Sequence, residues 1–142
     1  MKHLHQNLYV AGQIIASDFA SFKQAGIKAI INNRPDNEEP GQLSSVEAKR
    51  LATAHGINYH YLPMANGQPL PPNLVNDFKT ALESESGAVL THCRSGMRSS
   101  FLWALGQIPT GSVTVDEAIN AAQQAGIPLA NARAALENAQ KT

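Results

Sequence analysis

An apolar run that leads into the only cysteine of the chain, then through a short polar turn into a second apolar run, constrains the fold more than any other feature. Residues 88–92 read Ala-Val-Leu-Thr-His, which is typical of a buried strand, and Cys93 follows at once. A turn with Ser95 and Gly96 leads past Arg98 to a helical run from Ser99. Since a strand, a turn and a helix form the building unit of α/β folds, the stretch predicts a thiol at a strand end, at the mouth of a loop that opens a helix.

The same loop predicts an anion site in front of a nucleophile. Backbone N–H groups of a turn that opens a helix can point inward and bind negative charge, and the helix dipole adds positive potential. Positive surroundings favour the thiolate form of a cysteine, so we predict Cys93 as the nucleophile and Arg98 as a bidentate partner of two substrate oxygens. The other predicted substrate-binding groups of the loop are Arg94, Ser95, Gly96 and Met97. This combination suits attack on a phosphate ester or on a sulfane sulfur donor.

Strand-like and helix-like segments alternate along the whole chain. This pattern predicts an α/β fold with a central, mainly parallel sheet of four to five strands and helices on both faces. The expected strands are 8–11, 27–32, 57–62 and 88–92, and the expected helices are 17–24, 44–54, 72–83, a run from 99, 114–125 and 130–140. Ser44 with Glu47, and Thr114 with Glu117, have the spacing of capping boxes at two of the helix starts. The length of 142 residues fits a single domain over residues 1–142.

Three loops should meet at one edge of this sheet, because sites in open α/β sheets lie beyond the carboxyl ends of the strands. They are residues 33–43, 63–71 and 93–98. In the first loop, Arg34 is a candidate substrate-binding residue. The second loop holds no Asp or Glu, whereas the first holds Asp36, Glu38 and Glu39.

The loop resembles the active-site loop of the cysteine-based protein tyrosine phosphatases. Five residues match their signature, namely His92, Cys93, Gly96, Arg98 and Ser99, although four residues between the Cys and the Arg is the length found in rhodaneses. The segments 8–13, 30–36, 38–42 and 92–96 resemble one family in particular, a bacterial phosphatase-like domain also found fused in beta-lactamase hydrolase-like proteins. The resemblance runs from about Leu4 to about Asn138. This domain of unknown function is similar in fold to dual-specificity phosphatases.

The resemblance implies a hydrolase that acts on phosphate esters through a phosphocysteine intermediate. In that reading, His92 tunes the hydrogen bonds of the loop and the thiolate, and Ser99 donates to the thiolate and helps it leave. Phosphatases of this type usually carry an aspartate in the loop that corresponds to residues 63–71. Since this loop has no Asp or Glu, Asp36 is the leading candidate for the acid that protonates the leaving group, ahead of Glu38 and Glu39. Two alternatives remain open. A short loop without an acid also suits a rhodanese-like sulfurtransferase that carries a cysteine persulfide, and the cradle alone could make a module that binds phosphate or sulfate without turnover.

Composition narrows the expected partners. The formal net charge is zero, which does not favour nucleic acid or an acidic membrane as a partner. We expect no cofactor and no metal, because the histidines lack metal-ligand spacing with Cys93. No apolar stretch approaches the ~20 residues of a membrane span, and the N-terminus has no signal-peptide core. Because the chain has one cysteine, it cannot form an intramolecular disulfide, and we expect a soluble cytoplasmic protein. Its expected substrate is a phosphorylated small molecule or protein.

Overall fold

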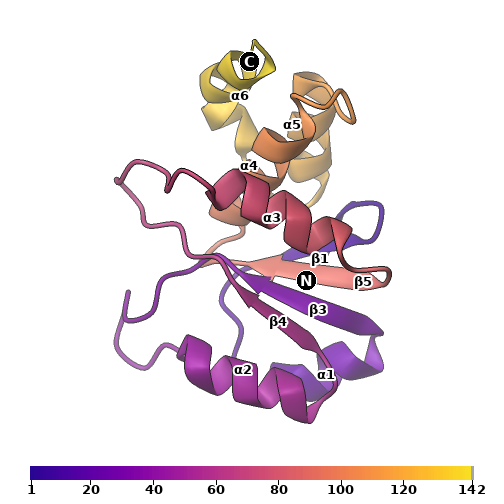
Figure 1. Cartoon of the computed structure of the whole chain (residues 1–142), viewed down its shortest axis with the longest axis vertical. Helices are drawn as coiled ribbons and strands as arrows, with labels where there is room; N and C mark the ends of the chain where they lie inside the picture. Colours follow the sequence, from indigo (N-terminus) through magenta and orange to yellow (C-terminus); the bar gives the residue numbers. More distant parts are fainter. Residues whose placement is uncertain (142) are drawn as a thin grey trace.

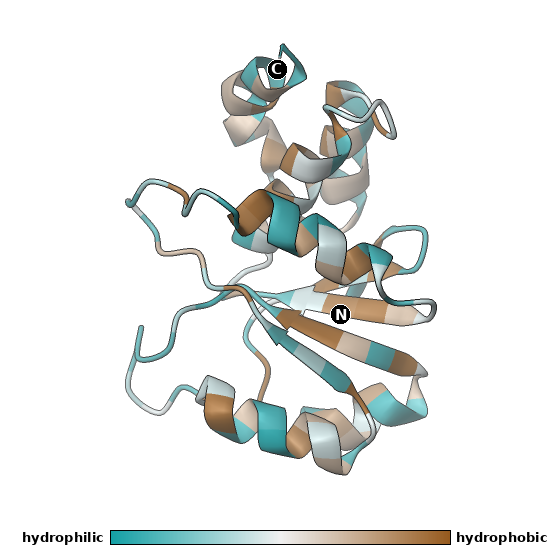
Figure 2. Cartoon of the chain, in the orientation of Figure 1, coloured by the Kyte–Doolittle hydropathy of each residue, from teal (hydrophilic) through white to brown (hydrophobic). Residues whose placement is uncertain are grey.

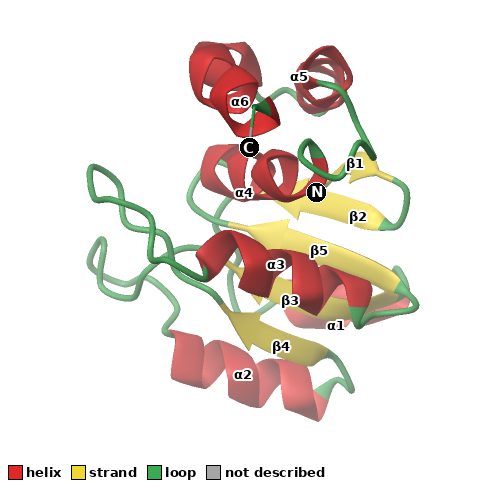
Figure 3. Cartoon of the chain, turned by 45° about the horizontal axis from the view of Figure 1, so that its top comes forward, coloured by secondary structure: helices red, strands yellow, loops and turns green. Residues whose placement is uncertain are grey.

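The structure, a computed structural model that describes residues 1–141, is built on one five-stranded sheet. The strands lie side by side in the order β1-β2-β5-β3-β4 (Figure 3). Their bounds are β1 Lys2–His5, β2 Leu8–Ala11, β3 Ile27–Asn32, β4 Asn58–Tyr61 and β5 Ala88–His92. Strands β2, β5, β3 and β4 run parallel and β1 is antiparallel to β2. The predicted mainly parallel sheet is confirmed.

Helices cover both faces of the sheet, as predicted. The helices are α1 Asp18–Gln24, α2 Ser45–Ala54, α3 Leu74–Glu83, α4 Met97–Gln107, α5 Val115–Gln124 and α6 Arg133–Gln140, with a short 3-10 helix at Leu129–Ala132. Figure 1 shows α1 and α2 on one face and α3 and α4 on the other, with α5 and α6 stacked beyond α4. The sheet thus separates two hydrophobic cores.

The central strands β3 and β5 contribute to both cores, which explains their continuous apolar runs. In β3, Ile31 packs on the side of α3 and α4, whereas Ile30 packs on the side of α1 and α2. Val89 and Leu90 divide in the same way in β5. Figure 2 shows the corresponding apolar colour along these two strands. Burial on both faces fixes the two strands at the centre of the sheet.

Several local features differ from the sequence prediction. Only half of the capping box predicted at Ser44 is present, because the Ser44 hydroxyl accepts from the N–H of Glu47 while the Glu47 carboxylate binds Arg50. The helix predicted at 130–140 is a 3-10 helix followed by α6.

Strand β1 was not predicted, because only Leu4 of its four residues is buried and a short, mostly polar strand gives no alternating pattern. Helix α4 begins at Met97 rather than Ser99, because Gly96 takes a left-handed conformation (φ 95°) that lets the helix start directly after it. The capping box of Thr114 and Glu117 is confirmed, with both of its hydrogen bonds present.

The parallel register brings the functional loops to one edge. His92 at the end of β5 lies opposite Ala11 of β2 and Asn32 of β3, and Asn32 in turn lies opposite Tyr61 of β4. The segments that leave these four strand ends therefore start next to one another (Figure 3). The predicted convergence of the loops at residues 33–43, 63–71 and 93–98 is found.

Candidate active site

Cys93 lies in the turn between β5 and α4, and its residue is fully buried. The backbone N–H of Gly96 donates a hydrogen bond to Sγ of Cys93 over 3.1 Å. Gly96 cannot carry a side chain easily: its φ is positive, and an added Cβ would lie 3.0 Å from Cδ1 of Ile127 and 3.2 Å from Cγ2 of Val10. The turn therefore wraps an amide donor onto the thiol at the N-terminal end of an eleven-residue helix.

The segment after β2 supports the turn from outside. The backbone N–H of Gln13 donates to the carbonyl oxygen of Arg94 over 3.1 Å. Gly12 permits this approach, because a Cβ at this position would lie only 2.7 Å from the same oxygen. A side chain at residue 12 would push the two segments apart and move the loop that carries Cys93.

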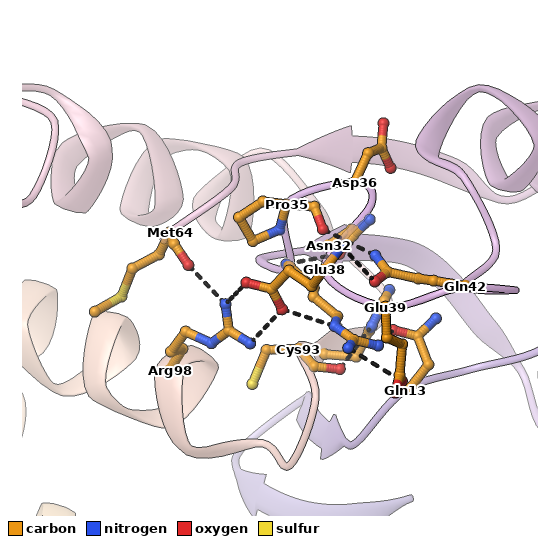
Figure 4. A network of polar contacts seen from close by, with 12 residues as sticks. Gln13, Asn32, Pro35, Asp36, Glu38, Glu39, Gln42, Met64, Cys93 and Arg98 are labelled. Carbon is orange, nitrogen blue, oxygen red and sulfur yellow. Dashed lines mark hydrogen bonds and ion pairs between the residues drawn. The ribbon is translucent and has the colours of Figure 1, made fainter. Parts of the chain in front are cut away.

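Arg98 is held by contacts to two other loops (Figure 4). Its Nη1 donates to Oε2 of Glu38 and to the carbonyl oxygen of Met64, both over 2.8 Å, and its Nη2 donates to Oε1 of Glu38 over 2.9 Å. The Arg98 hydrogen bond is the main reason why the pKa of Glu38 falls to about 2, with Arg34 adding to the effect. Glu38 is therefore ionised at neutral pH, and it is a member of the site rather than a minor candidate for the acid.

The geometry gives no support to Arg34 as the substrate-binding residue predicted from the sequence. Its side chain is 1% exposed, and all three guanidinium nitrogens donate within the protein. Nε donates to Glu38 over 2.8 Å, Nη1 to Oε1 of Gln13 over 2.9 Å and Nη2 to Glu39 over 3.1 Å. Arg34 thus links the loop at residues 33–44 to the segment after β2 through hydrogen bonds to Glu38, Glu39 and Gln13.

The geometry also gives no support to Asp36 as the acid. Its Oδ1 accepts from the backbone N–H of Ser45 over 2.8 Å, and its Oδ2 accepts from the hydroxyl of Ser45 over 2.7 Å. Both oxygens are therefore bound at the N-terminus of α2, where a carboxylate is favourable. In Figure 4, the Asp36 side chain points away from Cys93.

Asn33 is a buried residue whose side chain joins three segments by hydrogen bonds, a role that was not predicted from the sequence. Its Oδ1 accepts from the hydroxyls of Thr91 over 2.8 Å and Ser99 over 2.7 Å, and its Nδ2 donates to the carbonyl oxygen of Leu62 over 2.8 Å. The hydroxyl of Ser99 is thus donated to Asn33 and not to the thiol, which corrects the role predicted for it. A polar residue directly after a buried strand was the available signal.

The remaining predicted residues of the turn differ in exposure. Arg94 and Ser95 are exposed and Met97 is half-buried. The hydroxyl oxygen of Ser95 accepts from the backbone N–H of Met97 over 3.4 Å. Arg94 and Ser95 are therefore free to meet a substrate at the rim, while Met97 belongs to the first turn of α4.

His92 is buried at the end of β5 and is neutral at pH 7. Burial, with a smaller effect of the Arg34 charge, lowers the pKa of His92 to about 4. Its Nδ1 lies 3.4 Å from the carbonyl oxygen of Cys93. The ring therefore supports the backbone of the turn as a neutral group and does not add charge beside the thiol.

This burial makes stability depend on pH. An unfolded histidine has a pKa near 6.5, so between about pH 6.5 and 4 the unfolded chain binds a proton that the folded chain excludes. We expect the stability of the wild type to fall as the pH falls through this range, with His92 contributing at most about 1.4 kcal/mol per pH unit. His92→Gln should flatten this slope in urea unfolding at pH 7, 6, 5 and 4.5. Equal slopes for the two proteins would show that His92 is not buried in its neutral form.

Comparison with known proteins shows the family to which the chain belongs. Residues 1–112 match the model of the phosphatase-like domain of beta-lactamase hydrolase-like proteins. The chain belongs to this family. A beta-lactamase hydrolase-like protein of Agrobacterium fabrum is 34% identical over 110 residues, which are 78% of this chain and 25% of the relative. The chain thus spans about a quarter of the length of the curated relatives it matches.

Solved structures agree with the family. A Neisseria meningitidis protein named "putative phosphatase" has a TM-score of 0.87 and 34% identity, covering 97% of this chain and 96% of that one. TpbA of Pseudomonas aeruginosa, crystallised in complex with pTyr, shares the fold with a TM-score of 0.63 and 16% identity, covering 95% of this chain and 86% of that one. The family resemblance and the phosphatase-like fold predicted from the sequence are thus confirmed.

The C-terminal segment lies beyond the family match, and the connection after α5 contacts the turn of the site. Residues 113–141 follow the matched region, and within them Ile127 packs at the turn where a Gly96 side chain would stand. Figure 1 shows α5 and α6 next to α4, the helix that the turn opens. None of the helices formed by residues 1–141 has the length and apolarity that a membrane crossing requires.

Proposed function

We propose that this protein is a cysteine-dependent phosphatase that hydrolyses phosphate esters through a phosphocysteine intermediate. The observation that carries the proposal is the pairing of groups around Cys93. The amide of Gly96 donates to the sulfur, and α4, whose first turn carries Arg98, begins at the next residue. These groups are what a thiolate nucleophile and a bound oxyanion both need.

The proposed chemistry has two steps. The Cys93 sulfur attacks phosphorus, the S–P bond forms and the bond to the leaving oxygen breaks, while the turn amides and Arg98 hold the non-bridging oxygens. Water then attacks the phosphocysteine, the S–P bond breaks, and phosphate and the Cys93 thiolate are released. The neighbour TpbA was crystallised with pTyr, so aryl phosphates, including a phosphotyrosine side chain, are the first substrates that we propose. The nucleophile must stay reduced, which suits action in the cytoplasm.

A sulfurtransferase is the second candidate. Two observations favour it: only four residues separate Cys93 from Arg98, and the segment 63–71 holds no carboxylate. In that reaction, Cys93 would take the outer sulfur of thiosulfate as a persulfide and release sulfite, and cyanide would remove the sulfur as thiocyanate. No alkoxide leaves, so no acid is required.

One parallel assay separates the candidates. The full chain is offered p-nitrophenyl phosphate in one series, and thiosulfate with cyanide in the other, with Cys93→Ser as the control. We expect nitrophenol release by the wild type and none above background by the variant. Turnover of thiosulfate alone would establish the sulfurtransferase. Phosphate binding by calorimetry without either turnover would identify a binding module.

A further inference from the structure

We propose that Glu38 is a positioning residue that fixes the Arg98 guanidinium for oxyanion binding at Cys93. The inference rests on the proposed phosphatase function and adds a residue of the 33–44 loop to the site. It starts from the contacts in Figure 4, where a single carboxylate receives hydrogen bonds from two arginines.

The way in which Glu38 meets Arg98 leaves one edge of the guanidinium unused. Glu38 takes one N–H from each terminal nitrogen, and the Met64 carbonyl takes the other N–H of Nη1. Arginine has five N–H donors in a rigid plane. Two N–H groups remain, one on Nε and one on the side of Nη2 that faces Nε. They lie along the other edge of the guanidinium plane. In Figure 4, the Cys93 sulfur lies below the Arg98 guanidinium and the Glu38 carboxylate lies above it, so this free edge faces Cys93.

Glu38 is itself held in place by the buried Arg34. Nε of Arg34 donates to the same Oε1 that accepts from Nη2 of Arg98, and Nη1 of Arg34 is bound to Gln13. The backbone N–H of Glu38 donates to Oε1 of Gln42 over 3.2 Å. A chain of contacts therefore runs from the segment after β2, through Arg34 and Glu38, to the first turn of α4. It links the Arg98 side chain to the segment that follows β2.

Arg98 needs this support because the start of a helix is an unfavourable position for a fixed positive side chain. A cation in the first turn of a helix meets the positive end of the helix dipole, and a long side chain loses considerable rotamer entropy when it is fixed. An ionised carboxylate behind the guanidinium offsets both effects. Pre-organised donors reduce what must be ordered when the substrate binds and in the transition state.

A role for Glu38 as a competitor of the substrate would predict the opposite effect of its removal. If Glu38 stood where substrate oxygens must bind, it would compete with phosphate, and its removal would strengthen phosphate binding and turnover. If Glu38 positions Arg98, its removal weakens both. The sign of one substitution therefore decides between the two.

The test compares Glu38→Gln with Glu39→Gln. Both variants lose one carboxylate from the same loop, but the carboxylate of Glu39 accepts from Arg34 and not from Arg98, and its side chain is 47% exposed. We expect Glu38→Gln to lower kcat/KM for p-nitrophenyl phosphate by about 10–100-fold, since small misplacements of catalytic groups cost up to about 10²-fold. The affinity for inorganic phosphate, measured by calorimetry, should fall as well. Glu39→Gln should change either quantity less than about threefold. Unchanged or improved values for Glu38→Gln would overturn the proposal.

Two further measurements separate positioning from general damage. In an Arg98→Lys background, Glu38→Gln should add less than about a twofold loss, because residues that act as a unit are not additive. An independent, full additional loss would contradict the proposal. The Nε–H signal of Arg98 in a ¹⁵N spectrum, assigned with Arg98→Lys, should broaden or shift strongly in Glu38→Gln and stay sharp in Glu39→Gln. This signal reports positioning even if the wild type hydrolyses no phosphate ester, so the two proposals can fail separately.

Discussion

Arg98→Lys is expected to lower kcat/KM for p-nitrophenyl phosphate by about 10²–10³-fold, the range seen when one pre-organised transition-state donor is removed. Lysine keeps the positive charge but loses the planar fork that binds two oxygens at once. It also cannot reproduce the three hydrogen bonds that Arg98 donates to Glu38 and Met64. Steady-state kinetics at several substrate concentrations, with folding checked by thermal unfolding, would measure the loss.

Arg94→Lys is the matched control for this substitution. Arg94 lies in the same turn but is exposed, so its charge is screened by solvent and the exchange should cost less than about threefold. If Arg94→Lys proved the more damaging change, the oxyanion would be bound at the rim of the turn, and the roles assigned to the two arginines would have to be exchanged.

The strand, turn and helix around Cys93 could be predicted from the sequence because their signals are local. The apolar run of β5, the Gly96 turn and the capping box at Thr114 each lie within a few residues. Near-continuous apolar runs predicted β3 and β5 as strands, whereas their position at the centre of the sheet is known only from the structure. Strand β1 escaped prediction because it is short and polar, and its pairing with β2 is decided by tertiary contacts.

The inner arrangement of the site was not predictable in the same way. Glu38 and Arg98 are sixty positions apart, and nothing in either segment indicates that they pair. Arg34 and Asp36 lie in the expected loop, but whether their side chains face the thiol or the interior depends on partners elsewhere, Gln13 for Arg34 and Ser45 for Asp36. Sequence patterns located the loops, whereas hydrogen bonds between the loops set the direction of each side chain.

The orientations of these side chains determine whether a carboxyl group is available to protonate a leaving group. The three carboxylates of the 33–44 loop are all bound: Asp36 by Ser45, Glu38 by two arginines and Glu39 by Arg34. The pKa of Glu38 is lowered to about 2, so at neutral pH it carries no proton to give. The segment 63–71 contains no Asp or Glu. Leaving groups that need no protonation should therefore be strongly preferred.

Along a series of phosphate esters, kcat/KM should fall steeply as the pKa of the leaving group rises. A general acid typically contributes about 10²–10⁴-fold, so we expect at least that difference between p-nitrophenyl phosphate and an alkyl phosphate. Asp36→Asn is the decisive variant, since it keeps the size of the side chain and one acceptor for Ser45 while removing the titrating group. We expect it to leave the steepness of the series unchanged, and we expect any high-pH limb of the rate profile to be the same in the variant as in the wild type. If it instead slowed only the poor leaving groups and abolished that limb, Asp36 would have to leave Ser45 and turn toward Cys93 when the substrate binds, and the acid predicted from the sequence would be the acid after all.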